Sequence, residues 1–291
     1  MSEVRILDAC HFPPAGTPVD LAVSGGPDSL GLLLLALEAD LVVTVHHVDH
    51  GLRATSGDDA RFVESLGREL GVPVVTHVVA VAGGANLEAR ARAARRTVLA
   101  PGALTGHTMD DLAETIVLNL LRGAGLDGLS PMVQDPTKPL RDVRRAALHD
   151  YVAVSGVVAR HDETNDDPRY RRNRVRHEVV PLLNEVAERD VVPILAHQAA
   201  LLFDERAWLD ELVADERALE AVDCRELRAW PRARLRRWLR ERLRDTRDDE
   251  AHPPSGADVE RAIAVVTGEA VAAQLAGARR LSRRHQFLTL E

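Results

Sequence analysis

The side chains best suited to chemistry in this sequence lie in one short loop near the N-terminus. The loop follows an apolar strand pattern at residues 21–23, precedes a leucine-rich helix pattern, and consists of Ser24, Gly25, Gly26, Pro27, Asp28 and Ser29. Its glycines let the backbone turn sharply and approach a ligand without a Cβ atom in the way, and its proline suits the first position of a helix. Because the N–H groups and the positive dipole end of that helix face outward, we expect the loop to bind phosphate. The alternative is an ordinary Gly-Gly turn in which Asp28 or Ser29 caps the helix.

Two other polar segments also follow strand patterns. Residues 46–53 follow a β-branched run at 41–45, and residues 106–111 follow a short run at 103–105. Strands and helices alternate through this half of the chain, which predicts βαβ units, a parallel sheet and helices on both faces. Since the carboxyl ends of parallel strands meet at one edge of a sheet, we expect the three polar loops to gather there. His50 and Arg53 are then candidates to contact phosphate, unless His50 only caps its loop.

The character of the sequence changes near residue 190. Beyond that point no strand pattern with turn residues recurs, and apolar residues follow a helical period. We therefore predict an α/β fold, with a doubly wound, mainly parallel sheet in residues 1–192 and a smaller all-helical domain in residues 193–291. Within the second domain the segment 225–247 is rich in arginine, with tryptophan and leucine at helical spacing, and is a candidate RNA-binding helix.

The composition limits the class of protein. The 291 residues carry a net charge of −8 and are 45% apolar, which is enough for packed cores. Cys10 and Cys224 are far apart and form no C-x-x-C pair, which argues against a structural zinc site or a disulfide framework and fits a reducing cytoplasm. The N-terminus lacks a signal-peptide pattern and the longest apolar runs are too short to span a bilayer, so we expect no membrane association.

The loop at Ser24 is not a Walker loop, because no lysine follows Gly26. Its pattern S-G-G-x-D-S after a strand resembles the PP-loop of the ATP pyrophosphatases, which binds pyrophosphate while ATP is split between its α and β phosphates. Several ordered blocks over residues 20–183 narrow this resemblance to the tRNA(Ile)-lysidine synthetases, in a short form with one C-terminal domain. Among these blocks are V-D-H-G-L-R at 48–53, N-x-E-x-x-A-R-x-x-R at 86–95 and H-x-x-D-D-x-A-E-T at 107–115.

The resemblance implies two chemical steps. ATP adenylates the C2 oxygen of the wobble cytidine in an isoleucine tRNA with a CAU anticodon, and free L-lysine then attacks C2 and expels AMP. The loop at residues 24–29 is thereby implied to bind ATP, and Asp28 is a candidate ligand for Mg²⁺, a hard ion that prefers carboxylate and phosphate oxygens. The candidate catalytic residues are Asp28, His50, Arg53, Asp111 and Glu114. A homodimer is expected by analogy with the family only.

Lysine is a cation, so its pocket should be acidic. Asp111 and Glu114 stand three residues apart on one predicted helix and share a face. We expect them to bind the ammonium groups of lysine, with Asp110 nearby, although the two aspartates also suit the dipole of a helix N-terminus. On another helix Arg92 is a candidate for binding lysine or the nucleotide, as is Arg95, unless both lie on a solvated face.

Arginines also supply candidate contacts to the tRNA backbone, because phosphate contacts dominate nucleic-acid affinity. Five arginines fall within residues 169–176, next to acidic residues at 162–167. The candidate contacts are Arg141, Arg169, Arg172 and Arg176. The alternative is a network of arginine–aspartate ion pairs within this segment.

Other functions are compatible with a PP-loop. A tRNA thiolase would need well-placed cysteines, and Cys10 and Cys224 lie before the first strand and in the tail. An amide-forming PP-loop synthetase would need a glutaminase partner domain, which is not evident here. A non-catalytic, ATP-gated RNA-binding module would bind tRNA and ATP without releasing pyrophosphate.

Overall fold

The computed structural model describes residues 5–49, 56–79, 94, 97–160, 166–214, 223–244 and 254–291. The chain forms two compact units. Unit 1 contains residues 1–122 and 130–199, and unit 2 contains residues 123–129 and 200–291. The predicted boundary after residue 192 falls at the start of helix α9 (Val192–Glu211), whereas the two units divide within this helix. No break in the sequence marks that division, because one continuous helix contributes to both units.

A four-stranded sheet forms the centre of unit 1. Its strands are β1 (Pro18–Ala22), β2 (Val42–Asp49), β3 (Val74–Val78) and β4 (Leu104–Thr105), in the order β3-β2-β1-β4. Each pair of neighbours among these strands is parallel. The predicted parallel α/β fold is thereby confirmed, and the segments that follow β1, β2 and β4 begin at one edge of the sheet.

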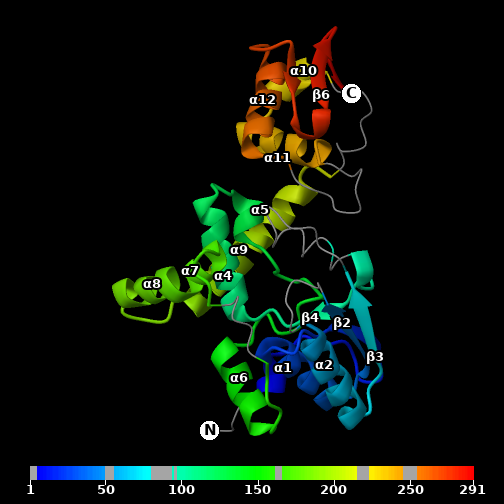
Figure 1. Ribbon diagram of the computed structural model, residues 1–291. Helices are drawn as coiled ribbons and strands as arrows, with labels where there is room; N and C mark the ends of the chain where they lie inside the picture. The colour runs from blue at the N-terminus through cyan, green and yellow to red at the C-terminus, as the bar shows by residue number, and fades with distance from the viewer. Residues whose placement is uncertain are drawn as a thin grey trace. The chain divides into compact units, whose positions relative to one another are not determined.

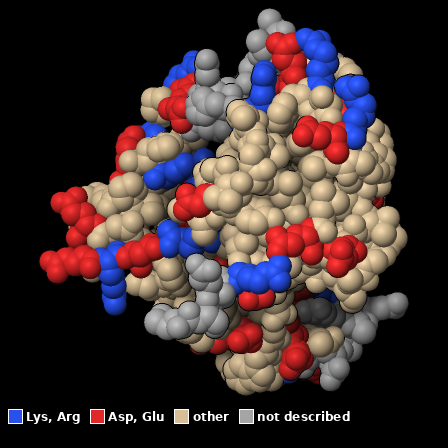
Figure 2. Space-filling model, turned by 90° about the horizontal axis from the view of Figure 1, so that it is seen from below, with Lys and Arg blue, Asp and Glu red and all other residues tan. Residues whose placement is uncertain are grey.

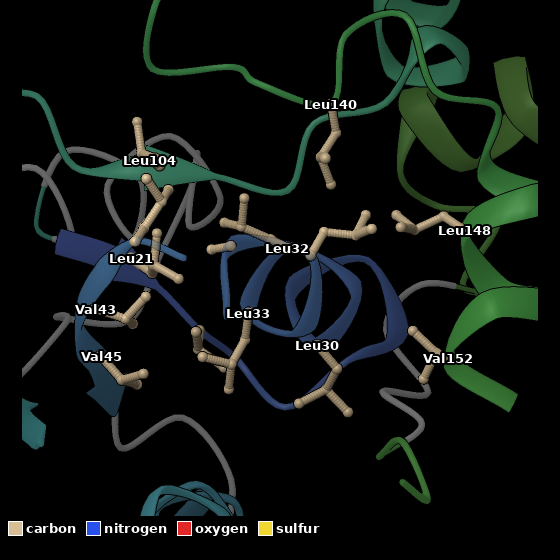
Figure 3. Packing of buried hydrophobic residues seen from close by; sticks show 14 of the residues in the cluster. Leu21, Leu30, Leu32, Leu33, Val43, Val45, Leu104, Leu140, Leu148 and Val152 are labelled. Carbon is tan, nitrogen blue, oxygen red and sulfur yellow. The ribbon is translucent and has the colours of Figure 1, made fainter. Parts of the chain in front are cut away.

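Helix α1 (Pro27–Glu38) is apolar on nearly all sides because other elements pack on two of its sides. Side chains of the sheet, among them Leu21, pack on one side of it. Leu148 of helix α6 (Arg145–Val154) packs on the other side, as Figure 3 shows. Burial of each leucine in this cluster contributes about 2 kcal/mol. The loop of residues 24–29, which we call the phosphate loop after its expected ligand, runs into the first turn of α1. This packing therefore fixes the end of the loop in unit 1.

Unit 1 contains further helices among its described residues. They are α2 (Ser56–Leu70), α4 (Met109–Leu121), α7 (Arg171–Arg174) and α8 (Val180–Ala187), with a 3-10 turn at Ile6–Ala9 and a π-helical turn at Val175–Val179. Helices α1 and α2 lie on the same side of the sheet (Figure 1). The predicted helix that begins at Asn86 lies largely outside the described residues.

Unit 2 combines helices with a small antiparallel sheet. Its elements besides α9 are α5 (Leu126–Leu129), α10 (Cys224–Arg228), α11 (Arg232–Arg242), α12 (Gly256–Thr267), β5 (Ala272–Gln274), a 3-10 turn at Ala276–Ala278, β6 (Arg280–Arg284) and β7 (Phe287–Leu290). The strands pair in the order β5-β6-β7. This sheet corrects the prediction of an all-helical domain. The strands are short and β6 reads Arg-Leu-Ser-Arg-Arg, which shows no regular alternation of apolar and polar residues.

None of the helices in the described ranges is both long enough and apolar enough to cross a lipid bilayer.

Candidate functional site

The loop between β1 and α1 has the geometry of an anion site. Gly25 has a φ of +90°, a conformation that side chains rarely adopt, and Pro27 stands in the first turn of α1. The loop is braced internally, because the Ser24 N–H donates to Ser29 Oγ at 3.1 Å and that hydroxyl donates to the Gly26 carbonyl at 2.9 Å. The first N–H groups of α1 have no intrahelical acceptor, so they can bind a ligand.

Two of the three predicted loops meet at this point. Gly106, which follows β4, packs so closely on Asp28 that a Cβ atom on it would lie 2.5 Å from the Asp28 carbonyl oxygen. A glycine is required there, because the atoms it would meet belong to the backbone. The expectation that these two loops gather at one edge is confirmed. Outside the described residues lie His50, Arg53, Arg92 and Arg95.

Helix α4 begins just after this contact and carries the carboxylates predicted to bind lysine. Thr108 caps it, since its side chain accepts from the Asp111 N–H at 3.4 Å while Asp111 Oδ2 accepts from the Thr108 N–H at 2.9 Å. Asp110 performs a similar role for α6. Its Oδ2 accepts from the Arg145 N–H at 2.7 Å and pairs with the Arg144 guanidinium at 3.2 Å. Both aspartates thus have structural roles at helix starts.

Three guanidinium groups enclose the carboxylates of Asp111 and Glu114. Asp111 Oδ1 accepts from Arg145 and Arg172, each at 2.9 Å, while its Oδ2 binds the helix cap. Glu114 Oε1 accepts from Arg145 at 2.9 Å and from Arg176 at 2.7 Å. Its Oε2 accepts from Arg172 at 2.9 Å and from Arg176 at 3.2 Å. Each carboxylate oxygen therefore already accepts two hydrogen bonds. We call these five residues the arginine–carboxylate cluster.

Neighbouring positive charges control the ionisation of Asp111. Burial alone would raise the pKa of Asp111, but the charges of Arg145 and Arg172 outweigh it and hold this pKa below its usual range. Burial would also lower the pKa of Arg145, and the charges of Asp111 and Glu114 instead raise it. Asp111 is therefore ionised at neutral pH. A lysine ammonium that reaches this carboxylate has to displace one of the guanidiniums.

Helix α6 also connects the cluster to the phosphate loop. His149 Nε2 lies 2.8 Å from Asp28 Oδ1, and Arg145 Nε lies 3.7 Å from Asp28 Oδ2. Sequence reasoning missed both α6 residues. The one available signal was their spacing, because residues four apart on a helix share a face.

The Asp28 carboxylate fits the predicted role of an Mg²⁺ ligand. Mg²⁺ usually binds through one or two carboxylates together with substrate phosphates and water. Asp28 stands in the first turn of α1 beside the loop, and its side chain is 32% exposed. One oxygen, Oδ2, has only the distant Arg145 Nε nearby at 3.7 Å among the described residues. A carboxylate so placed can share a metal ion with bound phosphates.

The four arginines predicted to contact tRNA lie in different settings. Arg172 and Arg176 are turned to the cluster, with side chains 19% and 23% exposed. Arg169 is 86% exposed and pairs with Asp167, and Arg141 donates to backbone carbonyls at 3.3 Å. Arg169 thus forms an ion pair within its own segment, as in the alternative interpretation, whereas Arg172 and Arg176 pair with the carboxylates of α4. Contact with tRNA stays a prediction for all four arginines.

Comparison with known proteins identifies the fold and the family. Residues 6–183 match the PP-loop domain family. A solved structure with a similar fold is the U34-tRNA thiolase NcsA from Methanococcus maripaludis with its [4Fe-4S] cluster. Its TM-score is 0.53 at 14% identity, over 69% of this chain and 77% of that one, so the likeness concerns the fold alone.

Two relatives are more closely similar in sequence. The chain is 39% identical over 243 residues to the tRNA(Ile)-lysidine synthase of Thermobifida fusca, which covers 76% of this chain and 74% of that one. It is 43% identical over 182 residues to the tRNA(Ile)-lysidine synthase of Thermus thermophilus, which covers 58% of this chain and 36% of that one. The resemblance expected from the motifs is confirmed. The chain belongs to the PP-loop family and, within it, to the tRNA(Ile)-lysidine synthases.

Proposed function

We propose that the protein, as an ATP-dependent tRNA ligase, joins free L-lysine to C2 of the wobble cytidine of tRNA(Ile) with a CAU anticodon. In this reaction ATP first adenylates the C2 oxygen and releases pyrophosphate, and the ε-amine of lysine then displaces AMP to give lysidine. The observation that carries the proposal is the braced phosphate loop in a chain whose relatives are named tRNA(Ile)-lysidine synthases.

The ATP end of the reaction needs groups that accept negative charge. Pyrophosphate leaves with a high charge, and preorganised N–H donors stabilise such a leaving group. We assign this role to the loop from Ser24 to Ser29, with Asp28 as the ligand of Mg²⁺. The ion, when bound, supplies charge neutralisation at the phosphates. His50 and Arg53 are proposed to contact the phosphates from the second loop.

The lysine end of the reaction needs a pocket for a cation. We assign the ammonium groups to Asp111 and Glu114, with Asp110 beside them and Arg92 for the rest of lysine. The contacts of Asp111 and Glu114 place a condition on this assignment, because their oxygens already accept two hydrogen bonds each. Lysine can bind there only if an arginine gives up its acceptors.

The tRNA is proposed to bind through phosphate contacts. Arg169 is the most exposed of the proposed contacts, at 86%. The arginine-rich segment 225–247 is a second candidate, and four of its arginines on α11 already pair with Glu260 or Asp127 within unit 2. We assign the backbone contacts to Arg141, Arg169, Arg172 and Arg176. We expect the protein to act in the cytoplasm, and a homodimer stays an expectation from the family.

A thiolase reaction is less well supported. Burial raises the pKa of the Cys10 thiol to about 12, and a thiol so rarely ionised is a poor nucleophile. Cys224 lies in the hydrophobic core of unit 2. Neither cysteine therefore has the environment of a catalytic thiol.

Transfer of labelled lysine tests the proposal. The full-length protein is incubated with ATP, Mg²⁺ and an isoleucine tRNA with a CAU anticodon, and the label in the tRNA is counted. A methionine tRNA, which shares the CAU anticodon, is the control and should remain unlabelled. Pyrophosphate release without lysine transfer would contradict the proposed ligation, and ATP and tRNA binding with neither product would support a binding module instead.

A further inference from the structure

Arg145 lies between the phosphate loop and the arginine–carboxylate cluster. Its two Nη atoms bind Asp111 and Glu114 at 2.9 Å each, and its Nε lies 3.7 Å from Asp28 Oδ2. Arg145 is the first residue of α6, and its side chain is 15% exposed. One guanidinium therefore connects the residues proposed for ATP with those proposed for lysine.

Of the three guanidiniums in the cluster, that of Arg145 is the least well satisfied. Arg172 and Arg176 each donate from Nε to Glu114, at 2.9 and 2.7 Å. The buried Nε of Arg145 has no hydrogen-bond partner in the part of the chain that the structure describes. An unsatisfied buried donor costs about 1–3 kcal/mol. Arg145 is therefore the arginine of the cluster whose hydrogen bonds are least complete.

The charges of the cluster lead to the same residue. Within the cluster three guanidiniums face two carboxylates, and the third carboxylate near Arg145 is that of Asp28, 3.7 Å from its Nε. If Arg145 leaves, Arg172 and Arg176 still balance the two carboxylates. An ammonium group that takes the place of Arg145 then restores the original charge. The exchange thus avoids the large penalty of leaving a buried charge unpaired.

We propose that Arg145 is a positioning residue whose guanidinium exchanges with the ammonium group of the substrate lysine. Lysine takes over the acceptors at Asp111 Oδ1 and Glu114 Oε1. The freed guanidinium turns to Asp28, which already faces its Nε, and to the nucleotide phosphates beside the loop. This inference rests on the proposed function, and it makes the phosphate loop sensitive to the filling of the lysine pocket.

The variant Arg145→Gln tests the exchange, because it removes the competitor of lysine. The KM for lysine and the Kd from equilibrium binding of labelled lysine should both fall about tenfold or more. The turnover number should fall as well, since no guanidinium reaches Asp28. A purely structural role would leave the lysine KM unchanged or raise it, and either result overturns the proposal. Arg174→Gln is the control, because Arg174 pairs with the exposed Glu178 on its own helical segment. Its KM and Kd for lysine should match those of the wild type.

A second variant covers the case in which Arg145→Gln does not fold, as judged by circular dichroism. Arg145→Lys keeps the charge, but one ammonium cannot hold both carboxylates as the forked guanidinium does. Its lysine KM should also lie below that of the wild type, and a KM equal to or above the wild-type value overturns the exchange. The activity of the wild type shows whether the exchange alone or the proposed function as a whole is wrong. If the wild type transfers no lysine, both proposals fail, whereas transfer with an unchanged KM in the variants overturns the exchange alone.

Discussion

Gly106 lies where the segment after β4 touches the backbone of Asp28. In Gly106→Ala the new Cβ atom would lie 2.5 Å from the Asp28 carbonyl oxygen, so the phosphate loop has to move. Such overpacking costs about 1–3 kcal/mol, and we expect ATP affinity, measured by calorimetry, to fall about tenfold or more. Gly256→Ala is the control, because an added Cβ there meets no atom within 4 Å. Equal ATP affinities in the two variants would contradict the placement of ATP at this loop.

Glu114 is the most deeply buried carboxylate of the cluster, at 2% exposure. Glu114→Gln should raise the KM for lysine far more than the KM for ATP, because it removes negative charge from the proposed lysine pocket only. It should also lower the free energy of unfolding by about 3 kcal/mol, since buried guanidiniums lose their partner. Glu178→Gln is the control, at an exposed ion pair with Arg174, and should change neither the KM values nor the free energy of unfolding. A similar rise in both KM values would contradict the assignment of Glu114 to lysine.

The sequence predicts the phosphate loop and the acidic pair as parts of the site, but not the arginine that lies between them. The loop is a local motif, in which glycine, proline and serine act on their own neighbours. Arg145 is 34 residues from Asp111 along the chain. Their contact depends on how α6 packs near α4, which no spacing within either helix reveals. Arg172 and Arg176 were predicted to contact tRNA rather than Asp111 and Glu114, because the composition of a segment shows its charge but not its long-range ion pairs.

At the scale of elements, the short helix α5 is held to α11 by buried ion pairs within unit 2. Asp127 accepts from Arg237 at 2.5 Å and from Arg240 at 2.5 Å, and the Arg237 side chain is only 7% exposed. Asp127→Ala should therefore destabilise unit 2 by about 3 kcal/mol, because a buried guanidinium loses a partner. Denaturant unfolding followed by tryptophan fluorescence measures this, since Trp208, Trp230 and Trp238 all belong to unit 2.

The control for this change is an ion pair of similar type at the surface. Glu260 pairs with Arg232 and Arg236 and is 46% exposed. Glu260→Ala should cost less than about 1 kcal/mol, as exposed ion pairs usually do. Equal losses of unfolding free energy in Asp127→Ala and Glu260→Ala would show that the buried pairs do not hold α5 in place.

The elements of unit 1 were more predictable than those of unit 2. The strands β1 and β2 include polar residues, such as Asp20 and His46, but the apolar or β-branched runs at 21–22 and 42–45 mark both. Helix α1 is a leucine-rich run after a proline, so local pattern and burial agree there. In unit 2 the strands have three to five residues, and β6 carries arginine at three of its positions. Pairing in the sheet, rather than local sequence preference, makes these residues strands.

The whole protein has a net charge of −8, and its proposed partner, tRNA, is also negatively charged. Figure 2 shows basic side chains next to acidic ones on the face it draws, rather than one continuous basic area. On this face, phosphate contacts would come from individual arginines rather than from one basic area. We expect the affinity to fall as salt is raised, and Arg169→Gln should reduce the slope of log Kd against log salt by about one.

The control for the salt dependence is Arg5→Gln, at another exposed ion pair, with Glu38. This variant should keep the wild-type slope. A tRNA affinity that does not change with salt would exclude phosphate contacts by Arg169 and by the other proposed arginines.

We propose that the protein forms a bond between lysine and the wobble cytidine. The most direct measurement is mass spectrometry of the nucleosides from tRNA(Ile) with a CAU anticodon, after incubation with ATP, Mg²⁺ and lysine. We expect the wobble cytidine to gain the mass of one lysine less one water, and Asp28→Ala to leave it unmodified. An unchanged cytidine after reaction with the wild type, or full modification by Asp28→Ala, would contradict the proposed ligation.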